Sequence, residues 1–424
     1  MALTREDAQR LDAEDRLAAF RDRFEIVDEH RLYMDGNSLG RLPKAVRGRV
    51  NAQMDDWGAR MVSGWPEWID APTRTGDALA DVIGARPGTV LVTDSVTVNL
   101  YKLVHALLDT DSSLRRIATD SENFPTDRYV LEGIARARGL ELVLFDAADP
   151  VHGPQPDEIP RDALVVLSHV GYRSGALTNM AAIDPLATVI WDLSHSAGVV
   201  PVNLEANGIR YAVGCTYKYL NAGPGSAGYL YIREPDALRS PIQGWFGQDD
   251  QFAMERPYAP APGITRFMAG TPPILVLAAV EEGVRITAEA GIEALREKSV
   301  AQTELMIALH DAWLTPLGFT LGSPREAHRR GSHVSLNHPE AWPICRALIE
   351  RADVVPDFRG PDSVRLGIAP LYTRFVDVWD AMDRLRGLVE RGEQREVDQT
   401  RARVWSTSRW TPRSTRSRRR SIAS

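Results

Sequence analysis

The segment TVLVTDSVTVNLYKLVHALLD (Thr89–Asp109) predicts a short buried strand followed by an amphipathic helix. The next residues repeat this order, with strand-like runs at 115–120 and 140–145 around a helical run at 128–139. Four further short apolar runs lie at Ala163–Val170, Thr188–Leu193, Tyr211–Tyr217 and Gly228–Ile232. Strands that alternate with helices indicate an α/β fold, in which a mostly parallel seven-stranded sheet is flanked by helices.

The rest of the chain suggests three further parts. Residues 4–25 carry apolar residues at helical spacing on a charged background, which predicts a surface helix. After Pro273, long helical segments broken near Gly291 lead into shorter mixed elements. We therefore expect an N-terminal helix and arm (1–60), a large domain (61–290), a smaller α/β C-terminal domain (291–392) and an Arg/Ser-rich tail (393–424). The tail lacks a periodic apolar face, so we expect it to be disordered.

Composition excludes several classes of protein. The 424 residues are 44% hydrophobic and 25% charged, as is typical of globular domains. The apolar runs are too short to span a bilayer, and the charged N-terminus has no apolar core of a secretory signal. The two cysteines, Cys215 and Cys345, provide no disulfide framework. We expect a cytoplasmic protein that does not associate with membranes.

The charge pattern is uneven. Only four of the 50 basic residues are lysines, so few side chains can supply an amine. Residues 401–424 hold eight arginines and no acid, which leaves 42 basic and 57 acidic residues, or −15, on the rest of the chain. An acidic body does not indicate a nucleic-acid partner. The nine histidines form no HExxH or comparable cluster, so no metal is expected.

Two polar side chains follow neighbouring strand-like runs. Asp192 ends the run at 188–193, and Lys218 follows the run at 211–217. Since ligands of open α/β sheets bind at the carboxyl ends of strands, these groups should face one crevice. A carboxylate for a pyridinium nitrogen and a lysine for a Schiff base are the groups that pyridoxal phosphate requires. The alternative is a solvated lysine and a turn cap. The other three lysines, in polar helical or loop settings, are interpreted as structural.

Two neighbouring segments could complete such a site. Asp94–Asn99 joins a strand to a helix, so free backbone N–H groups would face an anion. Phe124 lies at another strand end and could stack on a flat ring. Alone, the first segment is equally explained by a helix cap without a ligand, and Phe124 by a core position.

Seven motifs, in colinear order over about residues 5–392, resemble the kynureninase family of fold-type-I pyridoxal-phosphate enzymes, which are related to class-V aminotransferases. They are DGNSLG (Asp35–Gly40), TVNL (Thr97–Leu100), FPTD (Phe124–Asp127), WDLSHSAG (Trp191–Gly198), CTYKYLNAGPGS (Cys215–Ser226), GWFG (Gly244–Gly247) and GTPPIL (Gly270–Leu275).

The resemblance implies a role for each matching residue. Lys218 would form the Schiff base, Asp192 would pair with the pyridinium nitrogen, and Tyr217 would be an acid–base group. Arg365 would clamp the substrate carboxylate, while Trp65 and Asn37 would line the substrate pocket. The implied cofactor contacts are Val96, Thr97, Phe124, Asp127, Ser168, Asp192, His195, Tyr217, Lys218, Trp245 and Thr271. Some relatives have Asn at the position of Thr271, and Trp245 is expected to act from the partner subunit.

The implied reaction is hydrolytic Cβ–Cγ cleavage of L-kynurenine to anthranilate and L-alanine in a homodimer with active sites at the subunit interface. The sequence leaves open whether 3-hydroxykynurenine is also cleaved. Alternatives are another fold-type-I enzyme, such as a cysteine desulfurase or an aminotransferase, and a non-catalytic homologue. A desulfurase needs a mobile cysteine, whereas Cys215 would point away from Lys218 on one strand and Cys345 reads as a core residue.

Overall fold

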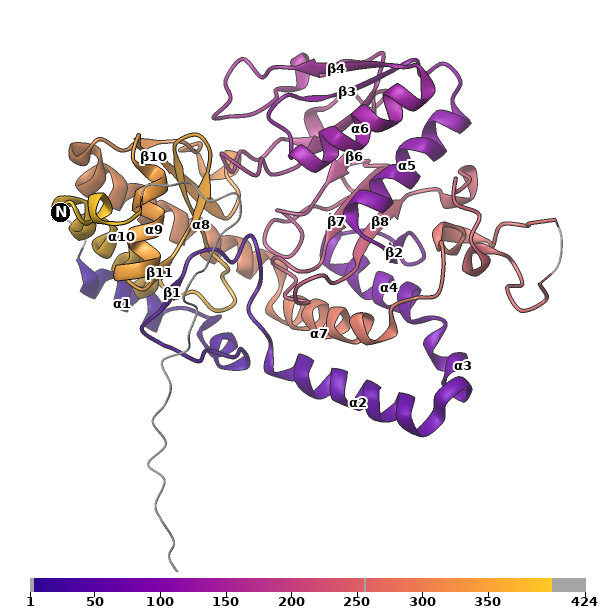
Figure 1. The fold of residues 1–424 in the computed structure, drawn as a ribbon, viewed down its shortest axis with the longest axis horizontal. Coiled ribbons are helices and arrows are strands. Elements are labelled where there is room, and N and C mark those ends of the chain that lie inside the picture. The colour runs from indigo at the N-terminus through magenta and orange to yellow at the C-terminus, as the bar shows by residue number, and fades with distance from the viewer. Residues whose placement is uncertain (1–3, 255–256, 399–424) are drawn as a thin grey trace, which may run out of the picture.

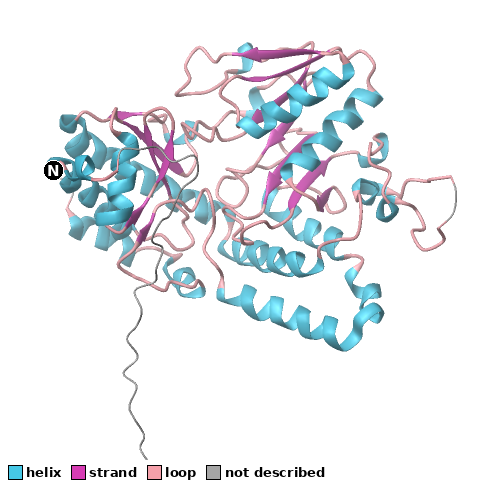
Figure 2. Ribbon diagram, in the orientation of Figure 1, coloured by secondary structure: helices cyan, strands magenta, loops and turns pink. Residues whose placement is uncertain are grey.

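The computed structural model of the chain describes residues 4–254 and 257–398 and contains one large and one small α/β unit (Figures 1 and 2). The large unit has a seven-stranded sheet of β2 (Val90–Val92), β3 (Arg116–Asp120), β4 (Glu141–Phe145), β5 (Leu164–Ser168), β6 (Thr188–Asp192), β7 (Tyr211–Cys215) and β8 (Gly228–Ile232). The strand order is β2-β8-β7-β6-β5-β3-β4, and only the pairs made by β8 are antiparallel. The predicted α/β class and mostly parallel sheet are confirmed.

Both faces of this sheet are buried under helices. Val189 and Trp191 of β6 pack in the core beneath α4 (Ala71–Ile83) and α7 (Ile274–Ala290). Ile190, between them, packs in the opposite core beneath α5 (Val96–Thr110) and α6 (Pro125–Arg138). Because successive side chains of a strand point to opposite faces, a strand covered on both sides needs an unbroken apolar run. This arrangement exposes the carboxyl ends of the parallel strands at one edge.

The small unit is built on a four-stranded antiparallel sheet of order β12-β13-β10-β9. Its strands are β9 (Thr320–Leu321), β10 (His333–Asn337), β12 (Asp357–Arg359) and β13 (Ser363–Gly367), and its helices are α8 (Ile292–Leu309), α9 (Ala341–Arg351) and α10 (Phe375–Glu390). The remaining elements are α1 (Arg5–Ala13), α2 (Lys44–Arg60), α3 (Trp65–Trp68), β1 (Leu32–Tyr33) and β11 (Val354–Val355). β1 pairs with β11, which attaches the N-terminal arm to the small unit.

The predicted single helix over residues 4–25 is wrong. Helix α1 ends at Ala13, and a separate 3-10 helix spans Ala18–Arg23. Tertiary contacts break the helical pattern, because Asp12 accepts hydrogen bonds from the first two amides of α10 and Asp15 pairs with Lys298 at 2.7 Å. A charged helical pattern thus conceals two acids that bind partners elsewhere in the chain.

The prediction that the other lysines lie in polar settings is wrong for two of them. Lys102 is fully buried and Lys298 is nearly so, each paired with an aspartate. The packed part of the chain continues through a 3-10 helix at Glu393–Glu396, whereas the remainder of the predicted tail, 399–424, lies outside the described residues. Within the described ranges, no helix is long and apolar enough to cross a membrane.

Candidate active site

Lys218 and His195 meet at the carboxyl end of the parallel strands. Lys218 lies in the turn after β7, and His195 lies in the turn after the adjacent β6. Lys218 Nζ is 3.0 Å from His195 Nε2. Burial and the neighbouring lysine hold the pKa of His195 well below its usual value, so the ring is neutral at pH 7 and its Nε2 accepts a hydrogen bond from the amine. With Nε2 as acceptor, the proton of the ring is on Nδ1, which is buried without a partner in the described structure.

Two carboxyl groups lie beside this pair in different surroundings. Asp192 Oδ1 accepts from the backbone amide and the hydroxyl of Ser194, at 2.9 and 2.6 Å. Asp127, on the first turn of α6, is 1% exposed, and its Oδ2 has no partner among the described residues. Burial, reinforced by the charge of Asp192, raises the pKa of Asp127 well above its usual value, and Lys218 only partly opposes this. Burial therefore favours the neutral form of Asp127.

Aromatic rings border the same space. Lys218 Nζ lies 5.8 Å from the ring centroid of Phe124 and 5.9 Å from that of Tyr217. Tyr172 packs edge-on against Phe124 at 5.4 Å. Burial and the neighbouring Cys215 raise the pKa of Tyr217, so its hydroxyl keeps its proton at pH 7. The phenol is consequently a proton donor.

Asn123 is a site residue that the sequence analysis did not single out. Its Oδ1 accepts from the Ser168 hydroxyl at 2.6 Å and from the Phe124 amide at 2.8 Å. These two bonds fix the backbone that carries Phe124 to the end of β5. The signal was its position immediately before Phe124, in a segment that follows a buried strand.

The predicted phosphate contacts begin helix α5. Ser95 caps the helix by accepting a hydrogen bond from the Val98 amide at 3.3 Å. Val96 and Thr97 are the first two helical residues, so their amides have no acceptor within the helix. Amides at a helix N-terminus attract anions. In the described part of the chain, no hydrogen bond or ring contact joins Trp245 or Thr271 to this region.

Arg365, on β13, is fully buried, and each of its nitrogens has a protein acceptor. Nη1 donates to Tyr172 O at 2.6 Å, and Nη2 donates to Ser38 Oγ at 2.6 Å and to Asp357 Oδ2 at 2.5 Å. With its amide oriented to satisfy both neighbours, Asn37 accepts from Arg365 Nε at 3.2 Å and donates to Asp35 at 3.2 Å. The sequence predicted the arginine but neither Ser38 nor Asp357.

The arm that carries Asn37 also reaches Lys218. The Gly40 amide donates to Tyr217 O at 2.8 Å. A Cβ on residue 40 would lie 2.4 Å from Lys218 O and 2.3 Å from Asn221 Oδ1, so only glycine fits this approach. One short segment therefore connects the arginine of the small unit to the lysine of the large unit.

Comparisons with known proteins identify the family. A model of the kynureninase C-terminal domain matches residues 295–385. The chain is 44% identical to a kynureninase of Pseudomonas fluorescens over 405 residues, which cover 92% of this chain and 96% of the relative. It is 40% identical to a kynureninase of Burkholderia pseudomallei, with 91% and 96% covered. The chain belongs to the kynureninase family.

Solved structures extend this kynureninase relationship at the level of fold. An apo cysteine desulfurase from Thermococcus onnurineus matches with a TM-score of 0.73 at 20% identity, covering 88% of this chain and 98% of that one. The cystine C–S lyase C-DES with its cysteine persulfide product matches with a TM-score of 0.73 at 18% identity, covering 86% and 97%. At such identities the likeness shows the shared fold alone.

Neither cysteine of this kynureninase-family chain is placed to act as the mobile nucleophile that a cysteine desulfurase needs. Both Cys215 and Cys345 are buried, and burial raises the pKa of each thiol. A buried, protonated thiol is a poor nucleophile. The strand argument against Cys215 is wrong in one respect, because β7 ends at Cys215 and Lys218 lies beyond the strand, so burial is the valid reason.

Trp65 and Trp245 lie close to each other, one on each side of a shared contact with Phe246. Both rings contact Phe246, at 5.8 and 4.3 Å between ring centroids. Trp245 is 41% exposed, and Thr271 is also exposed. In the described part of the chain, no hydrogen bond or ring contact joins Trp65, Trp245 or Thr271 to Lys218.

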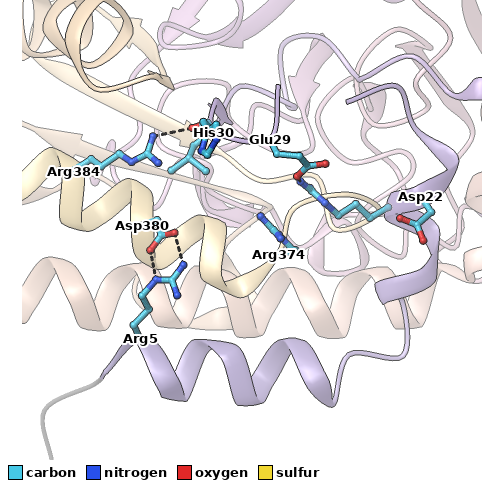
Figure 3. A pocket seen from close by; sticks show the side chains of 9 residues that line it. Arg5, Asp22, Glu29, His30, Arg374, Asp380 and Arg384 are labelled. Carbon is cyan, nitrogen blue, oxygen red and sulfur yellow. Dashed lines mark hydrogen bonds and ion pairs between the residues drawn. The ribbon is translucent and has the colours of Figure 1, made fainter. Parts of the chain in front are cut away.

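A separate cavity of about 610 Å³ lies between the arm and the small unit (Figure 3). It is lined by Arg5, Arg21, Asp22, Glu29, His30, Leu32, Arg374, Asp380 and Arg384. Its arginines bind protein groups, as Arg5 does to Asp380 and Arg384 to His30 O. None of the predicted site residues lines this cavity. In the described part of the chain, no three His, Cys, Asp or Glu side chains could together hold a metal ion.

Proposed function

We propose that the chain hydrolyses L-kynurenine to anthranilate and L-alanine with pyridoxal phosphate as cofactor. The observation that carries this proposal is the convergence of Lys218, Asp192 and His195 at one edge of the sheet in a member of the kynureninase family. The reaction adds water across the Cβ–Cγ bond, so that hydroxide ends on the carbonyl carbon and a proton ends on Cβ.

The residues present fit pyridoxal phosphate. The buried Asp127 Oδ2 and His195 Nδ1 lack partners in the described chain, and a polar ring substituent would satisfy them. Phe124 offers a face for a flat ring, and the amides of Val96 and Thr97 suit a phosphate. Lys218 is positioned to bind the aldehyde carbon. When bound, the cofactor supplies an electron sink for the carbanion at Cα.

The chain's own residues then divide the remaining work. Arg365 binds and orients the substrate carboxylate. Lys218 Nζ, once free, accepts the proton from Cα, and His195 accepts a hydrogen bond from that amine. Tyr217 holds a proton on its hydroxyl that it donates at the ketone. Asp192 stays positioned by Ser194 for the ring nitrogen.

We infer a homodimer that completes the site. The exposed apolar side chains Trp57, Met61, Val62, Trp245, Phe252 and Met254 lie on the segments on either side of the Trp65–Phe246 contact. Exposed apolar side chains in such number mark an interface. In a dimer, the surface with Trp65, Trp245 and Thr271 supplies the aryl and phosphate contacts of the neighbouring site. Trp245→Ala combined with Phe252→Asp should yield monomers in sedimentation, whereas a variant that stayed dimeric would exclude this interface.

The substrate assay is direct. The purified full-length chain should show the visible absorbance of a lysine-bound cofactor and release fluorescent anthranilate from L-kynurenine. A colourless protein that forms no product would contradict the proposal. A parallel assay with 3-hydroxykynurenine would determine the preference between the two substrates. The two free cysteines also favour a cytoplasmic enzyme, a placement that fractionation of the native host tests.

A further inference from the structure

Lys102 is a buried cation that the proposed reaction does not use. It lies on α5 with a fully buried side chain. Its Nζ is 2.7 Å from Asp94 Oδ2 and 2.7 Å from Phe267 O. Burial lowers the pKa of this lysine, and the adjacent carboxylate opposes the shift. The ammonium thus connects two segments that are more than 160 residues apart in the sequence.

The first partner of Lys102 is Asp94, which lies at the start of α5, where the phosphate is expected to bind. Asp94 immediately precedes Ser95, the cap of α5, and has a left-handed backbone with φ of 50°. Its carbonyl accepts a hydrogen bond from the Gly228 amide at 2.7 Å. Without a cation, this carboxylate would place a negative charge next to the amides of Val96 and Thr97. Such a charge would repel a phosphate.

The second partner, the carbonyl of Phe267, lies on the segment that leads to Thr271, one of the predicted cofactor contacts. Phe267 ends a 3-10 helix, Gly263–Phe267, four residues before Thr271. A Cβ on Gly244 would lie 1.6 Å from Ala269 O, so the segment that carries Trp245 packs directly on this backbone. Lys102 therefore holds in place the backbone from which Trp245 and Thr271 extend.

Stability alone does not account for this lysine. A buried ion pair is weak evidence for stability, because desolvation of both charges offsets their attraction, and an apolar side chain of the same length often serves as well. Lys298 offers a direct comparison. It is also buried and pairs with Asp15 at 2.7 Å, but it lies on α8 of the small unit, whereas Val96 and Thr97 begin α5 of the large unit.

We propose that Lys102 is a positioning residue for the cofactor phosphate, which neutralises Asp94 at the start of α5 and fixes the segment leading to Thr271. The inference rests on the proposed function only in that pyridoxal phosphate is the cofactor. It predicts that Lys102 affects binding of the phosphate group and leaves the contacts of the pyridine ring unchanged.

The test compares two ligands on the full-length chain after removal of cofactor. Lys102→Met should raise the Kd of pyridoxal phosphate by about tenfold or more, because the carboxylate of Asp94, left without its cation, would repel the phosphate. The Kd of pyridoxal, which has no phosphate, should stay the same. Lys298→Met removes an equally buried ammonium and should change neither Kd. Thermal unfolding of both variants reports the loss of stability separately.

Two results would overturn the proposal. In one, Lys102→Met binds both ligands as tightly as the parent. In the other, it weakens both equally, which would assign Lys102 to the packing of the whole pocket. If Lys102→Met does not fold, Lys102→Gln carries the same test, because its amide can still donate to Phe267 O. Absence of anthranilate formation by the parent would refute the proposed reaction and leave these affinities interpretable.

Discussion

At the Lys218 end of the pocket, Asp127 Oδ2 and His195 Nδ1 are buried without partners in the described chain. At the Arg365 end, every guanidinium nitrogen already donates to a protein acceptor. The polar atoms of a bound ligand could therefore pair with Asp127 and His195 at the Lys218 end. At the second end the guanidinium is paired with the protein's own Asp357, so a substrate carboxylate bound there, as we propose, would compete with an internal one. The two ends therefore offer different kinds of site.

The largest effect should follow from removing the amine. Lys218→Ala should lower kcat by ~10³-fold or more, because general-base removal alone costs about 10²–10⁴-fold. The visible absorbance of the lysine-bound cofactor should disappear at the same time. Stopped-flow and steady-state assays of anthranilate formation measure this change. Retained absorbance and turnover would show that another group binds the aldehyde.

The two acids at the Lys218 end should respond unequally. Asp192→Asn should reduce kcat by about 10²-fold, because the ring nitrogen loses its charged partner. Asp127→Asn should change kcat by less than about threefold, since burial raises the pKa of Asp127 and favours its neutral form, of which asparagine is an isostere. The pair of kcat values is the measurement. Equal losses would mean that Asp127 acts as an ionised group.

A substitution of Asp357 should test whether its carboxylate competes with the substrate carboxylate for Arg365. Asp357→Asn should lower the free energy of unfolding by ~3 kcal/mol, because it leaves a buried guanidinium without its charged partner. The same change should lower KM several-fold, since the substrate carboxylate no longer displaces an internal one. Chemical denaturation and steady-state kinetics report the two effects. A higher KM would instead indicate that Asp357 orients Arg365 for the substrate.

The smallest effect concerns pH. Burial and the charge of Asp357 raise the pKa of Asp35 to about 7, against the opposing charges of Arg365 and Arg359. Below this value Asp35 is protonated and neutral, and above it a second carboxylate lies near Arg365, 3.7 Å from Nη2. KM should therefore rise by about twofold as the pH is raised through about 7. Asp35→Asn should flatten this profile, and an unchanged slope would assign it to another group.

The Lys218 end could be predicted from the sequence to a greater extent than the Arg365 end. The order of strands and helices followed from apolar periodicity, and Asp192, His195 and Lys218 could be expected to converge because the carboxyl ends of parallel strands share an edge. Asp192 is the last residue of β6, and His195 and Lys218 follow β6 and β7 within three residues. Local pattern was sufficient there.

The Arg365 end depends on contacts that no local pattern carries. Asp35, Asn37 and Ser38 reach the arginine from more than 320 residues away, through an arm whose pairing with β11 has only two residues on each strand. The burial of Lys102 was equally concealed, although the apolar run around it was visible in the sequence. Partners of buried charges are set by tertiary packing, so only the folded chain reveals them.

The arm at residues 34–40 is hydrogen-bonded to both units. The Gly36 amide donates to Gly367 O in the small unit at 3.3 Å, and the Gly40 amide donates to Tyr217 O in the large unit at 2.8 Å. Neither amide can exchange its hydrogen with solvent until its own unit releases the arm. The exchange rate of the Gly36 amide therefore reports release of the arm from the small unit, and that of the Gly40 amide reports release from the large unit. The faster rate identifies the end of the arm that opens more readily.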